Sequence, residues 1–118
     1  MRAAILTISD KGSRGEREDK SGAAIRKIIE EMGGEIVEHA VVPDERDEIE
    51  RALRRMAGAA DLVLTTGGTG IAPRDVTPEA TRAVIEKELP GITEIMRLKS
   101  SEVAPTAMLS RAVAGTLG

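Results

Sequence analysis

The sequence predicts an α/β fold, a three-layer α/β/α sandwich on a mostly parallel sheet, in a single domain of residues 1–118. Apolar runs alternate with amphipathic helical segments in the order β-α-β-α-β-loop-α, the pattern of a parallel sheet with helices on both faces. The length suits one domain with one core, and no repeat or linker divides it. Because Phe, Trp and Tyr are absent, that core must consist of Ile, Leu, Val, Met and Ala.

The first strand and helix follow from the distribution of apolar residues. Residues 3–9 are predicted to form a buried strand, and residues 10–22 a polar loop. In the helix predicted over residues 23–32, four apolar side chains recur at i, i+3, i+4 and i+7 and so share one face: Ile25, Ile28, Ile29 and Met32. Gly33 and Gly34 end this helix.

Two further strands and a second helix come next. Residues 35–42 form the second predicted strand, and Pro43-Asp44 leads into a helix. Its apolar face has the same spacing and comprises Ile49, Ala52, Leu53 and Met56. Residues 61–66 form the third strand, which runs into a glycine-rich loop.

The remaining elements are helical. Thr77 is predicted as the N-cap of a helix with Pro78 at its first position, and Val84, Ile85 and Leu89 as its apolar face. Pro90-Gly91 ends that helix. Two shorter helices are expected near residues 92–99 and 105–114.

Composition narrows the function classes. The chain has no cysteine, which excludes disulfides, thiolate chemistry and cysteine-bound zinc and fits a cytoplasmic protein. The net charge is −3, with no basic block and no aromatic side chain to stack on bases, so we expect no nucleic-acid partner. No apolar run approaches the ~20 residues of a membrane span. The apolar stretch at the N-terminus reaches Asp10 too soon to be a signal peptide.

Polar residues follow each predicted strand. Ser9-Asp10 follows the first, Pro43-Asp44 the second, and the loop that contains Arg74-Asp75 the third. Ligands of parallel α/β sheets bind at the carboxyl ends of the strands. We therefore expect these residues to line one cleft. Taken alone, Ser9-Asp10 also fits an ordinary hydrogen-bonded turn.

The glycine-rich segment runs from Thr66 to Gly70 and reads Thr-Gly-Gly-Thr-Gly. Glycines 67, 68 and 70 let backbone N–H groups approach a phosphate closely. The segment is neither a P-loop nor a dinucleotide fingerprint. A tight strand-to-helix turn is the alternative.

Asp44 and Asp75 are the candidate metal-binding carboxylates. Mg²⁺ on nucleotide phosphates needs only one or two protein carboxylates. Two simpler roles remain open: Asp44 as a helix cap with Asp47 three residues on, and Asp75 as a surface partner of Arg74. The lone histidine, His39, lies mid-strand and is interpreted as structural, and the charged loop at 11–20 as solvated.

Four local patterns occur in order along the chain: "LTISDKGSRGEREDKSG", "VVPDE", "DLVLTTGGTGIAPRDVTPEAT" and "PTAMLSRAVAG". Together they resemble the molybdopterin adenylyltransferase family (MogA- and MoaB-like proteins and the matching domain of gephyrin). The resemblance covers essentially the whole chain. It implies Mg-ATP-dependent transfer of AMP to the terminal phosphate of molybdopterin, with release of pyrophosphate.

The resemblance also implies roles for individual residues. Asp44 and Asp75 would be catalytic and would handle Mg²⁺ and the triphosphate. Substrate and nucleotide binding would involve Ser9, Asp10, Thr66, Gly67, Gly68, Thr69, Gly70, Arg74, Ser110 and Arg111. Ser110-Arg111 matches the family's Ser-Arg pair near the pterin site, where an arginine suits a phosphate or the polar pterin edge.

The chain departs from the family in stopping at "AVAGTLG", before a further strand, a loop and a C-terminal helix. We expect a fragment or an early stop, and the alternative function is molybdopterin binding without transfer. The resemblance further implies a homotrimer, hand-off to a molybdate-insertion protein, and no membrane partner. It does not separate the molybdenum from the tungsten pathway.

Overall fold

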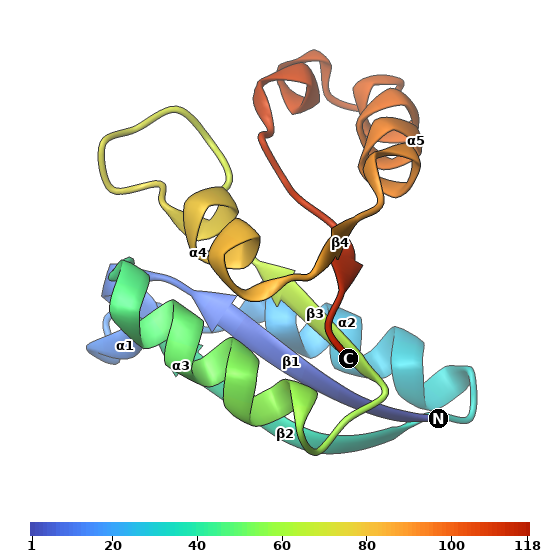
Figure 1. Cartoon of the computed structure of the whole chain (residues 1–118). Helices are drawn as coiled ribbons and strands as arrows, with labels where there is room; N and C mark the ends of the chain where they lie inside the picture. Colours follow the sequence, from blue (N-terminus) through green and yellow to red (C-terminus); the bar gives the residue numbers. More distant parts are fainter.

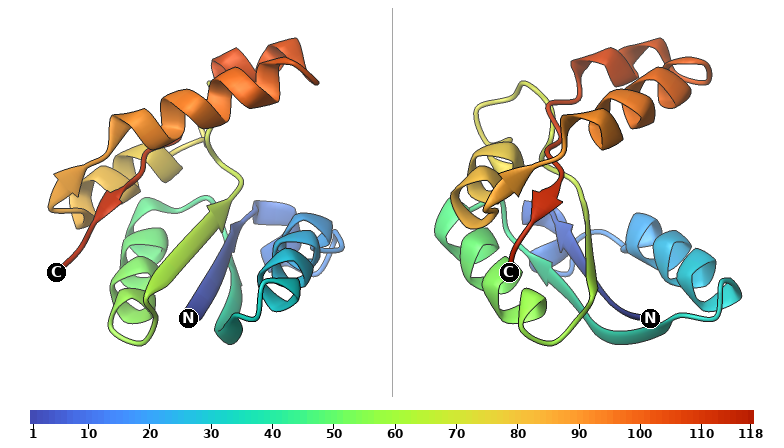
Figure 2. Two further views of the ribbon diagram at one scale, coloured as in Figure 1. Left: turned by 90° about the vertical axis from the view of Figure 1, so that its right-hand side faces the viewer. Right: turned by 45° about the vertical axis from the view of Figure 1, so that its right-hand side comes forward.

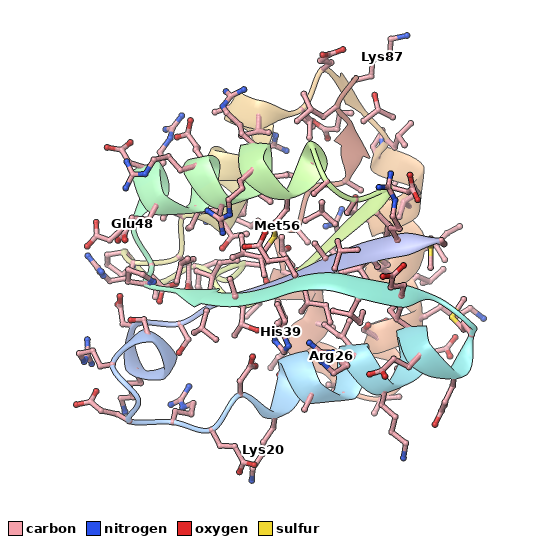
Figure 3. The ribbon with its side chains drawn as sticks, turned by 90° about the horizontal axis from the view of Figure 1, so that it is seen from below. Lys20, Arg26, His39, Glu48, Met56 and Lys87 are labelled. Carbon is pink, nitrogen blue, oxygen red and sulfur yellow. The ribbon has the colours of Figure 1, made fainter.

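A three-stranded parallel sheet in the order β2-β1-β3 forms the middle layer of the computed structural model, which describes all 118 residues. Its strands are β1 (Arg2–Ile8), β2 (Glu35–Val42) and β3 (Leu62–Thr66). Figures 1 and 3 show helices on both faces of this sheet. One outer layer is α2 (Lys20–Glu31); the other is α3 (Arg46–Ala57), with α4 (Thr77–Val84) packed beside it. The predicted three-layer α/β architecture is thus confirmed.

The central strand β1 is buried on both faces, as its apolar sequence predicts. Ala4, Leu6 and Ile8 join side chains of α3 and α4 in the main core cluster. Met56 of α3 belongs to the same cluster and lies between α3 and the sheet in Figure 3. Val42 and Thr66 close the neighbouring strands beside the end of β1, so the carboxyl ends of all three strands share one edge.

The predicted apolar face of α2 is only partly buried. Ile29 is 4% exposed, whereas Ile28 and Met32 are 56% and 71% exposed. Gly22, in the first turn of α2, is also buried. The periodicity located this helix correctly but overestimated how much of its apolar face meets the sheet.

Helix α4 differs from its prediction at both ends. Thr77 is its first helical residue rather than its cap; Val76 is the N-cap and makes no side-chain capping bond. The helix stops at Val84, and Leu89 lies outside it, 40% exposed. The early stop has a tertiary cause: the Glu86 N–H donates to the Thr116 carbonyl at 2.7 Å.

This pairing creates a second sheet that the sequence did not predict. Strands β4 (Lys87–Glu88) and β5 (Gly115–Thr116) are antiparallel. Between them, α5 (Pro90–Ser101) and the 3₁₀ helix η1 (Pro105–Leu109) form a hairpin that stands away from the main sheet (Figure 2). The expected helix at 92–99 is confirmed as part of α5.

Two further predictions need correction. The helix expected over residues 105–114 is only η1, because the chain turns extended at Ser110 and the Arg111 N–H bonds to the Thr69 carbonyl at 2.7 Å. The loop expected at 10–22 contains a short helix, α1 (Asp10–Ser13), capped by the Ser9 hydroxyl. No helix of the structure has the length and apolar character that crossing a membrane requires.

Candidate functional site

A cavity of about 740 Å³ opens where the three parallel strands end. The predicted site residues that line it are Ser9, Asp44, Thr66, Gly67, Gly68 and Asp75. The other predicted residues lie outside the lining: Asp10, Thr69, Gly70, Arg74, Ser110 and Arg111. The parallel sheet therefore brings together both candidate carboxylates and three of the five residues of the glycine-rich segment, as expected from the strand order.

Asp44 is fixed by the end of β1 rather than by the helix that follows it. The Asp10 N–H donates to Asp44 Oδ2 at 2.9 Å, and the Asp44 N–H donates to Asp10 Oδ1 at 3.0 Å. Glu45 is the N-cap of α3 and makes no side-chain capping bond, so Asp44 does not cap this helix. Burial raises the pKa of Asp44, and the negative charges of Asp10 and Asp75 add to this effect.

Arg74 reaches back from the loop to the ends of β1 and β2. Its guanidinium donates twice to Asp10, at 3.1 and 2.9 Å, and once to Glu45 at 3.0 Å. The bonds from Arg74 are the main cause that lowers the pKa of Asp10. Arg74 is thus committed to Asp10 and Glu45, which rules out the simple pairing with its neighbour Asp75.

The Asp75 side chain lines the cavity. Its Oδ2 accepts a hydrogen bond from the Ala72 N–H at 3.0 Å, and it forms no ion pair. Gly70 faces the same carboxylate: a Cβ at this position would lie 2.8 Å from Asp75 Oδ2. The glycine therefore leaves the space that the Asp75 side chain occupies.

The glycine-rich segment presents unused backbone donors. None of the N–H groups of residues 67–70 donates a hydrogen bond within the chain. Gly67 and Gly68 adopt φ values of +97° and +69°, which favour glycine. Thr77 fixes their carbonyls instead, through its hydroxyl to Gly67 at 2.9 Å and its N–H to Gly68 at 3.2 Å. Consecutive free N–H groups of this kind form an anion-binding concavity.

Asp19 belongs to the cavity wall, although the sequence analysis assigned its loop to solvent. Its Oδ2 accepts from the Thr7 hydroxyl and from His39 Nε2, both at 2.8 Å, and its Oδ1 accepts from the Gly22 N–H at 2.9 Å. A carboxylate only accepts, so His39 carries its proton on Nε2. Figure 3 shows His39 pointing from β2 toward α2. His39 therefore supports this wall.

A sequence signal for Asp19 did exist. An aspartate three residues before Gly22, at the start of an apolar helical period, is the pattern of an N-cap. The structure has Asp19 in that role for α2. The contacts with Thr7 and His39 join residues from three separate elements and follow only from the fold.

Replacing Asp19 with Asn is expected to lower the free energy of unfolding by about 1–3 kcal/mol at pH 7, because an amide N–H₂ would face hydrogen-bond donors. Burial opposes ionisation of Asp19, but the bonds from Gly22, Thr7 and His39 outweigh it and lower the pKa of Asp19. The carboxylate therefore stabilises the fold above its unfolded pKa of about 4, and this contribution is lost as pH falls below that value.

Urea unfolding of Asp19→Asn and of the unsubstituted chain, at pH 7 and at pH 3, tests this expectation. The difference between the two proteins should shrink at pH 3. Asp47→Asn is the matched control, because the exposed Asp47 side chain makes no side-chain hydrogen bond. A difference that grows on acidification would contradict the assignment.

Ser110 and Arg111 lie beside the glycine-rich segment and outside the cavity. The Ser110 hydroxyl donates to Thr69 Oγ1 at 3.4 Å. Arg111 directs its guanidinium at Gly70, Asp75 and Glu79. Figure 1 shows the C-terminal segment returning from η1 past the loop between β3 and α4.

The carboxylates and free N–H groups of the cavity suit a cation that is bound to phosphate. The structure has no group of three or more His, Cys, Asp or Glu side chains placed to hold a metal ion. Mg²⁺ bound through substrate phosphates and water needs only one or two carboxylates. Asp44 and Asp75, on one cavity with the free N–H groups of Gly67 and Gly68, meet that requirement.

Comparison with known proteins shows which family the chain resembles. The family described as "Probable molybdopterin binding domain" matches residues 4–117. A molybdopterin adenylyltransferase from Helicobacter pylori strain J99 is 49% identical over an alignment of 115 positions, which covers 94% of this chain and 65% of that protein. A molybdenum cofactor biosynthesis protein B from Halalkalibacterium halodurans is 47% identical over an alignment of 119 positions, which covers 98% of this chain and 69% of that protein.

A solved structure agrees with the sequence matches. The molybdopterin biosynthesis enzyme MoaB from Thermus thermophilus superposes with a TM-score of 0.91 at 50% identity. The match covers 99% of this chain and 75% of that one. The chain thus spans about two thirds of the length of the curated relatives it matches, with 65% of the Helicobacter protein covered.

Proposed function

The chain belongs to the molybdopterin-binding domain family, and on this premise we propose that it transfers AMP from Mg·ATP to the terminal phosphate of molybdopterin. The products are adenylylated molybdopterin and pyrophosphate. The name of the Helicobacter relative, 49% identical to this chain, supports this activity. The observation that carries the proposal is the placement of Asp44, Asp75 and free glycine N–H groups on one cavity.

The reaction needs no nucleophile from the protein. An oxygen of the terminal phosphate of molybdopterin attacks the α-phosphorus of ATP. A new P–O bond forms there, the bond from the α-phosphorus to the oxygen that bridges to the β-phosphorus breaks, and its electron pair leaves with pyrophosphate. Catalysis then consists of alignment and charge neutralisation, as in phosphoryl transfer generally.

The residues of the cavity suit those two tasks. Asp44 and Asp75 would hold Mg²⁺, which when bound neutralises charge on the phosphates. The N–H groups of Gly67 and Gly68 would donate to phosphate oxygens. Asp10 and Arg74 would keep Asp44 in place from outside the lining through the contacts described above.

Pyrophosphate release measured with the 118-residue chain tests the proposal. We expect release only when ATP, Mg²⁺ and molybdopterin are all present. Release without molybdopterin would indicate an ATP pyrophosphohydrolase and would contradict the proposal.

A second candidate function is molybdopterin binding without transfer. The observation that favours it is the description of the matching family, which names molybdopterin binding over residues 4–117 and no transfer. Fluorescence titration with molybdopterin distinguishes the two. Saturable binding without any pyrophosphate release in the presence of Mg·ATP would favour the binding function.

The oligomeric state and the downstream partner are part of the same proposal. Because the chain resembles the molybdopterin adenylyltransferase family, we expect a homotrimer that delivers its product to a molybdate-insertion protein. The reaction belongs in the cytoplasm, where ATP and Mg²⁺ are supplied. Size-exclusion chromatography with light scattering would test the trimer directly.

A further inference from the structure

Arg111 connects the C-terminal segment to both ends of the loop that carries Asp75. Its Nε donates to the Gly70 carbonyl at 2.8 Å, and its Nη2 donates to the Asp75 carbonyl at 2.8 Å. Its Nη1 donates to Glu79 Oε2 at 2.6 Å, in the first turn of α4. One side chain therefore contacts the start of the loop, its end and the following helix.

These contacts occupy the guanidinium. All three of its nitrogens donate to protein oxygens, and Nη2 makes a second, longer contact with Glu79 at 3.4 Å. The bonds from Arg111 are the main cause that lowers the pKa of Glu79, so both partners are charged at neutral pH. Arg111 does not line the cavity. This arrangement differs from the pterin or phosphate contact that the family resemblance implied.

The loop has few bonds of its own. Within residues 69–75, Asp75 and Ala72 exchange two hydrogen bonds: Asp75 N–H to the Ala72 carbonyl at 2.9 Å, and Ala72 N–H to Asp75 Oδ2 at 3.0 Å. The segment at 110–111 adds the Arg111 N–H to Thr69 bond and the Ser110 contact. The conformation of the loop therefore depends on contacts with residues outside it. These are the contacts of the segment at 110–111, more than thirty residues away along the chain, and the bonds of Arg74 to Asp10 and Glu45.

We propose that Arg111 is a positioning residue that sets the place of the Asp75 carboxylate by bracing the loop at Gly70, Asp75 and Glu79. This inference rests on the function proposed above. Asp75 acts on the Mg·ATP end of the reaction, so loss of the brace should affect magnesium dependence and turnover. Recognition of molybdopterin should be unaffected.

Two variants test the proposal. Arg111→Lys keeps the positive charge but cannot form the fork of bonds. Glu79→Gln keeps the bonds to both carbonyls and removes only the charged partner. Glu79 does not line the cavity, so an effect of Glu79→Gln on the reaction must be indirect. Arg82→Lys is the matched control, because the exposed Arg82 on the same helix contacts only Glu88 at 3.4 Å.

In steady-state kinetics, Arg111→Lys should lower kcat by about 10- to 100-fold, the cost of a small misplacement of an aligned group. The Mg²⁺ concentration for half-maximal rate should rise. The KM for molybdopterin should stay within about twofold, because the contacts that bind molybdopterin equally in the ground state and the transition state are unchanged. Glu79→Gln should give a smaller change in the same direction, and Arg82→Lys none. A raised KM for molybdopterin with unchanged Mg²⁺ dependence would overturn the proposal in favour of a substrate contact.

Hydrogen exchange gives a second reading that does not need activity. The N–H groups of Ala72 and Asp75, which are hydrogen-bonded within the loop, should exchange faster in Arg111→Lys than in the unsubstituted chain, whereas those of β1 should not change. Unchanged exchange at Ala72 and Asp75 would overturn the positioning role. If the unsubstituted chain transfers no AMP, the proposed function fails, while exchange still decides the role of Arg111.

Discussion

Replacing Asp75 with Asn is expected to reduce AMP transfer by at least ~100-fold, the usual cost of removing one group that stabilises charge in a transition state. Asp75 lines the cavity, and no Lys or Arg side chain forms an ion pair with it. An Asn oxygen can still accept the Ala72 N–H bond that Asp75 Oδ2 accepts at 3.0 Å. The loop should therefore keep its shape, and the fall in the transfer rate should come from the missing negative charge.

The measurement is the transfer rate at saturating substrates, together with molybdopterin binding and the circular dichroism spectrum. Binding and spectrum should be unchanged in Asp75→Asn. Asp47→Asn, on the exposed start of α3, should retain the full rate. A variant at Asp75 that kept most of its activity would remove this residue from the proposed machinery.

Replacing Gly67 with Ala should have the largest effect on stability, about 2–4 kcal/mol in the free energy of unfolding. Gly67 has a φ of +97°, which an L side chain rarely adopts. A Cβ there would also overlap the backbone carbonyl oxygen of Ile8, at the end of the buried strand β1. That oxygen belongs to the central strand and cannot move without disturbing the core.

Gly33→Ala is the control that separates strain from collision. Gly33 has a φ of +83°, and a Cβ there would meet no atom within 4 Å. Its substitution should cost only the conformational strain, about 1–2 kcal/mol. Urea unfolding of the two variants measures the difference, and equal losses would show that the contact with Ile8 has no energetic weight.

The parallel core was predictable because its signals are local. The unbroken apolar run of β1 and the spacing of Ile49, Leu53 and Met56 each occur within one element. Once the three strands are parallel, Asp44 and Asp75 must lie near one edge. The sequence therefore predicted the meeting of these carboxylates without any knowledge of their individual contacts.

The features that the sequence missed depend on distant segments. Helix α4 stops at Val84 because the following residues pair with β5, about thirty positions later. The guanidinium of Arg111 bonds to Glu79 and to two carbonyls of the loop, partners that lie more than thirty positions earlier in the chain. Helix periodicity contains no information on such partners.

Single residues with two plausible roles form a third group. Arg74 stands next to Asp75 in the sequence, yet it bonds to Asp10 and Glu45 across the strand ends. Asp44 precedes a helix, yet it bonds to the backbone of Asp10. Sequence neighbours and capping patterns suggested the simpler roles, and only the packing of the strand ends decides between them.

Transfer of label from ATP to molybdopterin tests the central claim most directly. The 118-residue chain would be incubated with Mg²⁺, freshly prepared molybdopterin and ATP labelled at either the α- or the γ-phosphorus. The account predicts that the α-label appears in the pterin product and the γ-label in pyrophosphate. An unlabelled pterin with folded, molybdopterin-binding protein, or γ-label in the pterin, would contradict adenylyl transfer by this chain.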